Sequence, residues 1–100
     1  MGTKIRWPHP GEILQLEFLE PMGITAYQLA KAIDVRQKRI GQIIAGKRSI
    51  TADTGLRLSK FFGLSEGFWI GLQTDYDLRI ARAALATQLD KIETYHAKAA

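Results

Sequence analysis

Amide and cationic side chains gather in one stretch near the middle of the chain, VRQKRIGQIIAGKR at residues 35–48. The side chains of interest are Gln37, Lys38, Arg39 and Gln42, followed by Lys47, Arg48 and Ser49. Glutamine forms paired hydrogen bonds with adenine, and arginine or lysine does so with guanine. Basic side chains also bind backbone phosphates without reading sequence. The first four residues are therefore candidates for base recognition, and the segment 47–49 for contacts to the backbone of the same nucleic acid.

A helix over roughly residues 36–45 would position these side chains. Its apolar stripe is Ile40, Ile43 and Ile44, at i, i+3 and i+4. Gly46 predicts a left-handed end to the helix. At about 100° per residue, Lys38 and Gln42 fall opposite the isoleucines. Gly41 costs around 1 kcal/mol in a helix relative to alanine, which indicates either a close approach of the backbone to a partner or simple tolerance.

A second short helix is predicted just before this one, from about Ala26 to near Asp34. Thr25 and Gln28 have the spacing of a capping box. Ala30 is small enough to let another helix cross closely. Two short helices with a tight turn and a basic, amide-bearing second helix are typical of a DNA-binding helix-turn-helix. Thr25, at the exposed amino end, is expected to offer its hydroxyl and amide groups to a phosphate.

The rest of the chain also predicts helices, because caps recur and no segment alternates apolar and polar residues. A first helix is expected from Pro10 to about Leu19, stopped by Pro21 and Gly23. A fourth is capped by Thr51 or Ser49 and ended by Gly63, with apolar contacts from Leu56, Leu58, Phe61 and Phe62. The fifth follows a cap at Ser65 and begins with Phe68, Trp69 and Leu72. The predicted fold is all-α with five helices.

The fifth predicted helix continues beyond what a five-helix core requires, with a bend expected near residues 74–77. Leu78, Leu85 and Ile92 recur every seven residues along it. This stripe predicts a dimer contact, a contact to another protein or a solvated helix, and its period does not choose between them. We expect an arm at 1–9, a DNA-binding domain at 10–82 and a C-terminal helical extension at 83–100.

Composition restricts the classes of function. The chain has 100 residues, 46% of them apolar, which predicts one domain with one core. Its 14 Lys and Arg against 10 Asp and Glu give a formal charge of +4, which favours an anionic partner. The absence of cysteine excludes disulfides and thiolate metal sites and favours a cytoplasmic location. The sequence shows no signal peptide and no apolar run of membrane-spanning length, so we expect no membrane partner.

The sequence contains few of the residue combinations that catalytic sites use. The only histidines, His9 and His96, lie at opposite ends of the chain. Neither has a neighbouring nucleophile or the spacing of a metal site. We therefore expect no enzymatic activity, no metal, no cofactor and no small-molecule substrate. His9 is interpreted as part of a helix N-terminus rather than as a ligand.

Several segments together resemble the HigA-type antitoxins, Xre/Cro-like helix-turn-helix proteins also labelled virulence-associated protein I. They are HPGEIL (9–14), EFLEPMGIT (17–25), LAKAIDV (29–35), GKRSITADTGLRLSKFFG (46–63) and FWIGLQTDYDL (68–78). The resemblance covers about residues 5–82. It implies a five-helix lambda-repressor-like fold and a homodimeric repressor that binds operator DNA of its own operon. It further implies a partner, a HigB/RelE-like RNase toxin that the antitoxin neutralises.

The resemblance also assigns roles to residues. Arg36, Gln37, Lys38, Arg39 and Gln42 match the base- and phosphate-contacting positions of the recognition helix. Lys47 and Arg48 match backbone contacts after it. The chain departs from the common pattern at Ala26, where many relatives have glutamine, and at Gly41, where a polar reader is frequent.

Two alternatives remain beside the antitoxin hypothesis. The first is a stand-alone Xre-type regulator that has the same fold and no toxin partner. A neighbouring gene for a RelE-like protein would separate these two. The second is an interaction module whose basic face binds RNA or an acidic protein.

Overall fold

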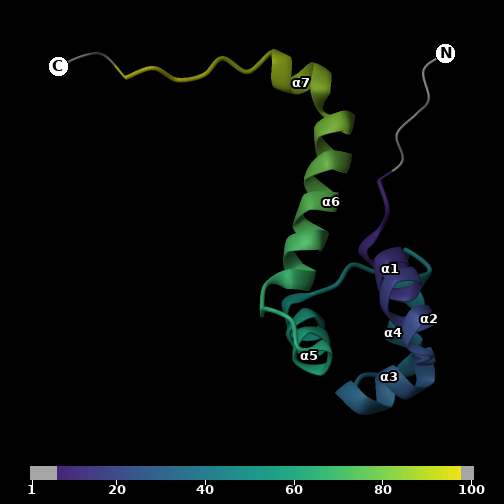
Figure 1. Cartoon of the computed structure of the whole chain (residues 1–100). Helices are drawn as coiled ribbons and strands as arrows, with labels where there is room; N and C mark the ends of the chain where they lie inside the picture. Colours follow the sequence, from purple (N-terminus) through teal and green to yellow (C-terminus); the bar gives the residue numbers. More distant parts are fainter. Residues whose placement is uncertain (1–6, 98–100) are drawn as a thin grey trace.

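A computed structural model describes residues 7–97, which form helices and loops without a strand (Figure 1). The elements are α1 (Pro10–Ile13), η1 (Leu14–Leu19), α2 (Glu20–Met22), α3 (Ala26–Ile33), α4 (Gln37–Ile44), α5 (Ala52–Phe62), α6 (Phe68–Ala84) and α7 (Ala86–Asp90). Since α1, η1 and α2 follow one another without a break, they form the first of the five predicted helices. The all-α prediction is confirmed, with α7 as an additional short helix. Residues 1–6 and 98–100 of the expected arm and extension lie outside the described residues.

The first helix is longer than predicted, because Pro21 does not end it. Before this proline, η1 is a π-helical segment in which the Glu20 N–H bonds to the Gln15 carbonyl, five residues back. A proline has no N–H to donate, and its ring collides with the carbonyl four residues earlier in a regular helix. The wider π turn relieves that collision. Gly23, with a φ of 67°, ends the helix instead.

Four helices end with the same backbone motif. A residue in the left-handed conformation follows α2, α3, α4 and α5, at Gly23, Asp34, Gly46 and Gly63. After α4, the Gly46 N–H bonds to the Ile43 carbonyl at 3.0 Å and the Lys47 N–H to the Gln42 carbonyl at 2.9 Å. This pair of bonds is the Schellman motif, which satisfies carbonyls at the helix end. The prediction for Gly46 is confirmed.

The core is built from one face of each of the five predicted helices and from Ile50 in the loop before α5. Its buried apolar residues are Leu14, Leu19, Leu29, Ala30, Ile33, Ile40, Ile43, Ile50, Leu58 and Trp69. Trp69 is fully buried, and its ring lies 5.0 Å from that of Phe18. Of the apolar residues predicted on α5, Leu58 is fully buried and the ring of Phe61 lies 5.0 Å from that of Phe62, but Leu56 and Phe61 remain 48% and 41% exposed. They lie on the outer side of α5, whose inner side is occupied by Leu58.

The predicted caps of the last two long helices are partly wrong. Thr51, not Ser49, caps α5, because its hydroxyl oxygen accepts from the Thr54 N–H at 3.4 Å. Gly67, not Ser65, precedes α6, and the Ser65 carbonyl accepts from the Phe68 N–H in the turn before it.

No break occurs in α6 near residues 74–77, where a bend was expected. Gln73 Nε2 donates to Asp77 Oδ1 at 3.0 Å across one turn, which supports the helix there. The helix breaks at Leu85 instead, where φ is −103° and ψ is 6°.

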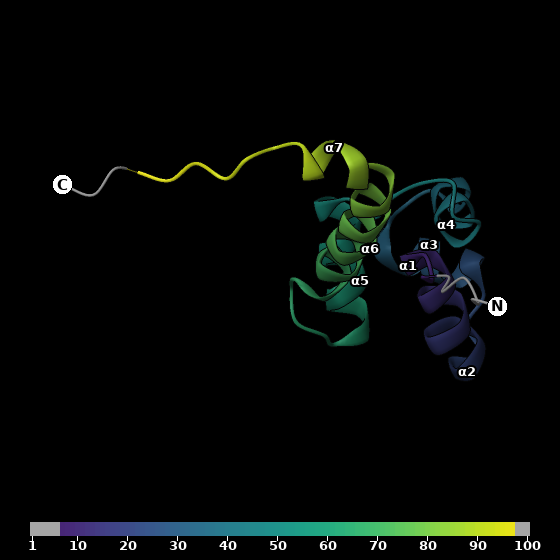
Figure 2. The ribbon, with the colours of Figure 1, turned by 90° about the horizontal axis from the view of Figure 1, so that it is seen from above.

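The C-terminal segment projects from the rest of the molecule. In Figures 1 and 2, α7 and the chain after it leave α6 on the side away from α1 and α4. Every residue from 81 to 97 is exposed. The expected helical extension is correct only as far as Asp90, because residues 91–97 form no helix. No helix between residues 7 and 97 is both long and apolar enough to cross a membrane.

Candidate nucleic-acid interface

Helices α3 and α4 pack against each other and are joined by a turn at residues 34–36. The predicted capping box begins α3. The Thr25 hydroxyl oxygen accepts from the Gln28 N–H at 3.0 Å, and Gln28 Oε1 accepts from the Thr25 N–H at 2.9 Å. Ala30 is buried, as expected for a residue near a close helix crossing. The local sequence thus fixes where α3 begins, whereas α4 begins after Arg36 without a side-chain cap.

Arg57 holds the turn between the two helices, and the sequence analysis missed this residue. Its Nη1 donates to the Ile33 carbonyl at 2.9 Å and to the Asp34 carbonyl at 3.4 Å. Its Nε bonds to Asp53 Oδ1 at 2.7 Å, four residues back on α5. A cation placed on the last carbonyls of a helix is favourable to the helix dipole. The only sequence signal was the Asp53/Arg57 spacing, which says nothing about contact with α3.

Gly11 sets the position of α4 against the first helix. A Cβ at residue 11 would overlap the carbonyl oxygen of Ile43, so the two backbones approach more closely than any side chain allows. Both residues are buried. The depth at which α4 sits in the domain is therefore determined by a glycine outside the helix-turn-helix pair.

The outer face of α4 carries the predicted recognition residues. Arg36, at the N-cap, and Gln37, Lys38 and Arg39 are all exposed, whereas Gln42 is half-buried. On the opposite face, Ile40 and Ile43 are fully buried. Five Lys or Arg and no Asp or Glu occur between residues 36 and 48. The exposed face is thus cationic and rich in hydrogen-bond donors.

The segment after α4 folds back beside this face. Arg48 Nε donates to Gln42 Oε1 at 3.0 Å. The Schellman motif at Gly46 makes this contact possible, because it reverses the chain at the end of the helix. A shallow surface depression is lined by Arg36, Lys38, Arg39, Gln42 and Arg48. The structure therefore brings together recognition-helix residues and one of the predicted backbone-contacting residues.

The other predicted backbone contacts lie at the edges of this surface. Lys47 and Ser49 are exposed in the loop between α4 and α5. Thr25 is exposed at the start of α3. Its backbone N–H already donates to Gln28. Of the two groups predicted to bind a phosphate, only the hydroxyl hydrogen therefore remains available.

Gln73 of α6 is a second residue whose role the sequence did not reveal. It is 4% exposed, and its Oε1 accepts from the Ile50 N–H at 2.8 Å. This bond ties the loop after Ser49 to α6. A single glutamine within an apolar run gives no periodic signal, so the contact appears only in the folded chain.

The predicted stripe of Leu78, Leu85 and Ile92 is exposed but does not lie along one helix. Leu78 belongs to α6, Leu85 forms the break, and Ile92 follows α7. Their exposed fractions are 53%, 45% and 68%. The heptad interpretation of a continuous helix is therefore wrong, because the break at Leu85 interrupts the repeat.

A model of the helix-turn-helix family matches residues 16–69. Virulence-associated protein I of Dichelobacter nodosus is 52% identical over 73 residues, which cover 73% of this chain and 68% of that protein. Antitoxin HigA-1 of Vibrio cholerae is 40% identical over 76 residues, or 76% of this chain and 71% of that protein. A solved structure of Pseudomonas aeruginosa antitoxin HigA with the higBA promoter has a TM-score of 0.85 and 39% identity, covering 91% of this chain and 100% of that one.

The residues that the family model matches lie within the region of about residues 5–82 over which the sequence resembles the HigA-type antitoxins. These residues include α3, the turn and α4, whose geometry is described above. The chain therefore belongs to the helix-turn-helix family that includes the HigA antitoxins and virulence-associated protein I.

Proposed function

We propose that this chain is a dimeric, cytoplasmic antitoxin that occupies an operator in its own operon and neutralises a RelE/HigB-like RNase toxin. The observation that carries the DNA-binding part is the amphipathic burial of α4, in which Gln37, Lys38 and Arg39 are exposed while Ile40 and Ile43 are fully buried. The similar Pseudomonas aeruginosa antitoxin HigA, whose structure was solved with the higBA promoter, supports the same conclusion. The chain's role is binding rather than catalysis.

In this proposal α4 enters the major groove, which is about 12 Å wide and admits one helix. Gln37, Lys38, Arg39 and Gln42 face base edges, while Arg36 serves either bases or phosphates. The flanking groups Thr25, Lys47, Arg48 and Ser49 hold phosphates on both sides of the groove. Since Arg48 bonds to Gln42 in the free protein, Gln42 is partly oriented before DNA arrives. The DNA-binding unit spans residues 10–82.

The proposed dimer uses the exposed apolar residues of the C-terminal segment, with Leu78, Leu85 and Ile92 as candidates. Helix-turn-helix dimers place two recognition helices about 34 Å apart, so the operator should be a palindrome. Replacing Leu78 and Leu85 with Asp would put charges into this contact. Sedimentation should then report a folded monomer whose operator affinity has collapsed. A folded double variant that stayed dimeric would move the contact elsewhere.

The decisive experiment measures two activities of the same protein. Its own promoter fragment should bind in preference to a scrambled fragment of equal length. The proposal expects a gene for a RelE-like protein beside this one, and co-expression of this chain should restore growth to cells that produce that protein. The double variant Lys38→Ala, Arg39→Ala should lose promoter binding but keep the growth rescue. Promoter binding without growth rescue would indicate a stand-alone regulator that has no toxin partner. A preference for single-stranded RNA over the promoter would contradict the operator assignment.

A further inference from the structure

Gln42 and Arg48 form a side-chain pair at the edge of the α4 surface. Arg48 Nε donates to Gln42 Oε1 at 3.0 Å, and both residues line the shallow depression beside the exposed face of α4. Only the oxygen of the amide can accept from this N–H, so the bond fixes which end of the Gln42 amide faces Arg48. The Nε2 amino group of Gln42 makes no hydrogen bond within the described part of the chain. This amino group is therefore the part of the amide that remains for a ligand.

The backbone that carries Arg48 is held on both sides. Before it, the Schellman motif bonds the Lys47 N–H to the Gln42 carbonyl at 2.9 Å. After it, the Ile50 N–H bonds to Oε1 of the buried Gln73 in α6 at 2.8 Å. A side chain on a backbone held in this way loses less conformational freedom when it binds a ligand.

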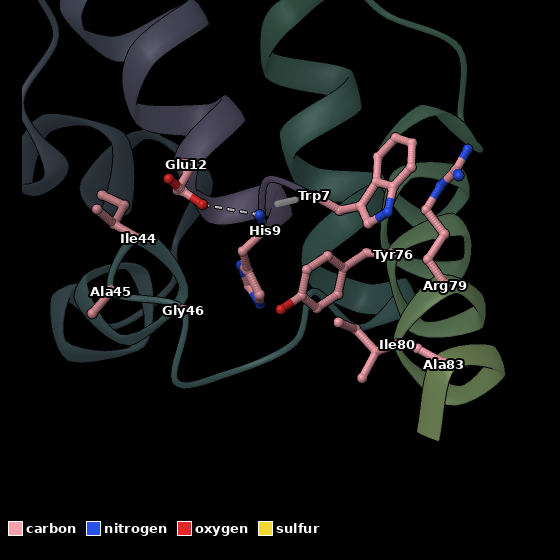
Figure 3. Close-up of a pocket in the computed structure, with 10 residues that line it drawn as sticks. All are labelled: Trp7, His9, Glu12, Ile44, Ala45, Gly46, Tyr76, Arg79, Ile80 and Ala83. Atoms are coloured by element: carbon pink, nitrogen blue, oxygen red, sulfur yellow. Dashed lines mark hydrogen bonds between the residues drawn. The ribbon is translucent and has the colours of Figure 1, made fainter. Parts of the chain in front are cut away.

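His9 supports the same turn. A Cβ built at Gly46 would lie 3.8 Å from the ring carbon Cγ of His9, and Figure 3 shows the turn at Ala45 and Gly46 beside His9. The His9 ring in turn meets that of Tyr76 in α6 edge to face, with centroids 5.0 Å apart (Figure 3). The folded domain therefore sets the position of Arg48 relative to Gln42 before any DNA is bound.

The two ends of a glutamine amide recognise different base edges. In the paired contact with adenine, the oxygen accepts from the N6 amino group and the nitrogen donates to N7. Gln42 Oε1 already accepts from a charged donor, and such bonds are roughly twice as strong as neutral ones. An adenine amino group would have to displace Arg48 or lie beside its cation. Guanine instead offers two acceptors, N7 and O6, which suit an amino group next to a positive charge.

We propose that Arg48 is a positioning residue that makes Gln42 a reader of guanine, with Oε1 held by Arg48 Nε and Nε2 donating to N7 and O6. This inference rests on the proposed operator binding and names the base that one residue of α4 recognises. The two Nη groups of Arg48 remain for a phosphate, so one guanidinium joins a backbone contact to a base contact. Arg48 thereby influences sequence preference, whereas the neighbouring Lys47 does not.

Base preference at single operator positions tests this assignment. Promoter duplexes carry each of the four bases in turn at every position of one half-site, and fluorescence anisotropy gives the affinity for each duplex. The position that loses its preference in Gln42→Ala is the one that Gln42 reads. There the wild-type protein should favour guanine over adenine by about tenfold. Replacing this guanine with 7-deazaguanine, which lacks N7, should weaken binding, whereas inosine, which keeps N7 and O6, should bind like guanine.

Arg48→Ala and its matched control Lys47→Ala separate positioning from charge. Both variants remove one exposed cation from the same loop, so both should bind every duplex more weakly. Only Arg48→Ala should also abolish the preference for guanine over adenine, because the released Oε1 can accept from the adenine amino group. In a Gln42→Ala background, Arg48→Ala should change the preference no further. Circular dichroism checks that every variant folds.

The free protein provides a measurement that needs no DNA. The Arg48 Nε–H should exchange with water more slowly in NMR spectra than that of Arg39, whose side chain makes no hydrogen bond within residues 7–97. This difference should vanish in Gln42→Ala. Equal exchange of the two arginines in the wild-type protein would overturn the held orientation of Gln42.

The outcomes separate this inference from the proposed function. A protein that prefers its promoter to a scrambled duplex, yet favours another base at the Gln42 position or has no such position, overturns the guanine assignment and leaves the function standing. An equal guanine preference in Arg48→Ala and Lys47→Ala does the same. If Arg48→Ala still changes the preference in the Gln42→Ala background, Arg48 reads the base itself and the inference is wrong. A wild-type protein that binds promoter and scrambled duplexes alike overturns the proposed function together with this inference.

Discussion

Gln42 differs from the other predicted base-reading residues, because it is half-buried and already bonded to Arg48. We expect Gln37→Ala and Gln42→Ala each to cost about 1–3 kcal/mol on the operator and much less on random DNA. Lys47→Ala should weaken both kinds of DNA alike, since phosphate contacts carry no sequence information. Fluorescence anisotropy with operator and scrambled duplexes measures the difference. Equal losses on both duplexes for the glutamine variants would remove their base-reading role.

His9 is a second residue with a measurable signature. Its Nδ1 accepts from the Gly11 N–H at 2.9 Å, and its own backbone N–H donates to Glu12 Oε1 at 3.1 Å, so the predicted role at a helix N-terminus is confirmed. Burial lowers the pKa of His9 below its ordinary value of 6.5, and this effect outweighs the carboxylates of Asp77 and Glu12, which raise it. The neutral ring is therefore the form that the folded state prefers.

This lowered pKa predicts a pH dependence of folding. The unfolded chain binds a proton near pH 6.5 and the folded chain only at lower pH, so stability from His9 is complete above 6.5 and is lost as the pH falls towards the folded pKa. Urea unfolding at about pH 7.5 and about pH 5 should show this loss. His9→Asn, which keeps a neutral cap, should reduce the difference between the two pH values. An unchanged difference would assign the loss to other groups.

At the scale of elements, the approach of α1 to α4 depends on Gly11. Gly11→Ala would place a methyl group where the Ile43 carbonyl oxygen lies. The nearest atoms belong to the backbone of Ile43 and Ile44, which cannot shift easily. We expect a loss of about 1–3 kcal/mol or more in the free energy of unfolding. Gly71→Ala is the control, because a Cβ at residue 71 of α6 meets nothing within 4 Å. It should stabilise by about 1 kcal/mol. Equal stability of the two variants in thermal melts would contradict the close approach.

Gly41 in α4 differs from Gly11, because its position has room for a side chain. A Cβ there meets nothing within 4 Å in the free protein, so the fold itself does not require this glycine. Gly41→Ala should stabilise the protein by about 1 kcal/mol, as Gly71→Ala does. If the backbone of α4 approaches the DNA at this point, only the residue 41 variant should bind the operator more weakly. Operator affinities of both variants, measured beside their melting temperatures, decide between close approach and tolerance.

At the scale of the whole molecule, the cationic surface around α4 predicts binding that is sensitive to salt. We expect Lys47 and Arg48, with Lys38 and Arg39 beside them where these also reach the backbone, to make several phosphate contacts per protomer. Counterion release lowers the logarithm of the affinity by about 0.9 per phosphate for each tenfold rise in salt. A titration on the promoter should therefore give a steep slope, and Lys47→Ala should reduce it by about one per protomer. A slope near zero would exclude this surface as the DNA contact.

Much of this molecule follows from local sequence. The caps at Thr25 and Thr51, the left-handed ends at Gly46 and Gly63 and the stripe of isoleucines each involve residues within one or two turns of one another. Short-range hydrogen bonds and helical periodicity depend on little else. For that reason the boundaries of α3 and α4, and the exposed face of α4, could be predicted from the sequence. The family resemblance was likewise confirmed.

Other features needed the tertiary structure, because they join residues far apart in the chain. The hydrogen bond from Arg57 to the Ile33 carbonyl spans 24 residues, and that from the Ile50 N–H to Gln73 spans 23. No local pattern encodes such contacts, and the exposure of Leu56 and Phe61 likewise depends on which face of α5 meets its neighbours. The sequence by itself determined the all-α class, the pair of helices α3 and α4 and the polar residues on the exposed face of α4. The tertiary structure decided how Gly11 seats α4 and where α6 breaks, because each depends on the packing of elements that sequence proximity does not connect.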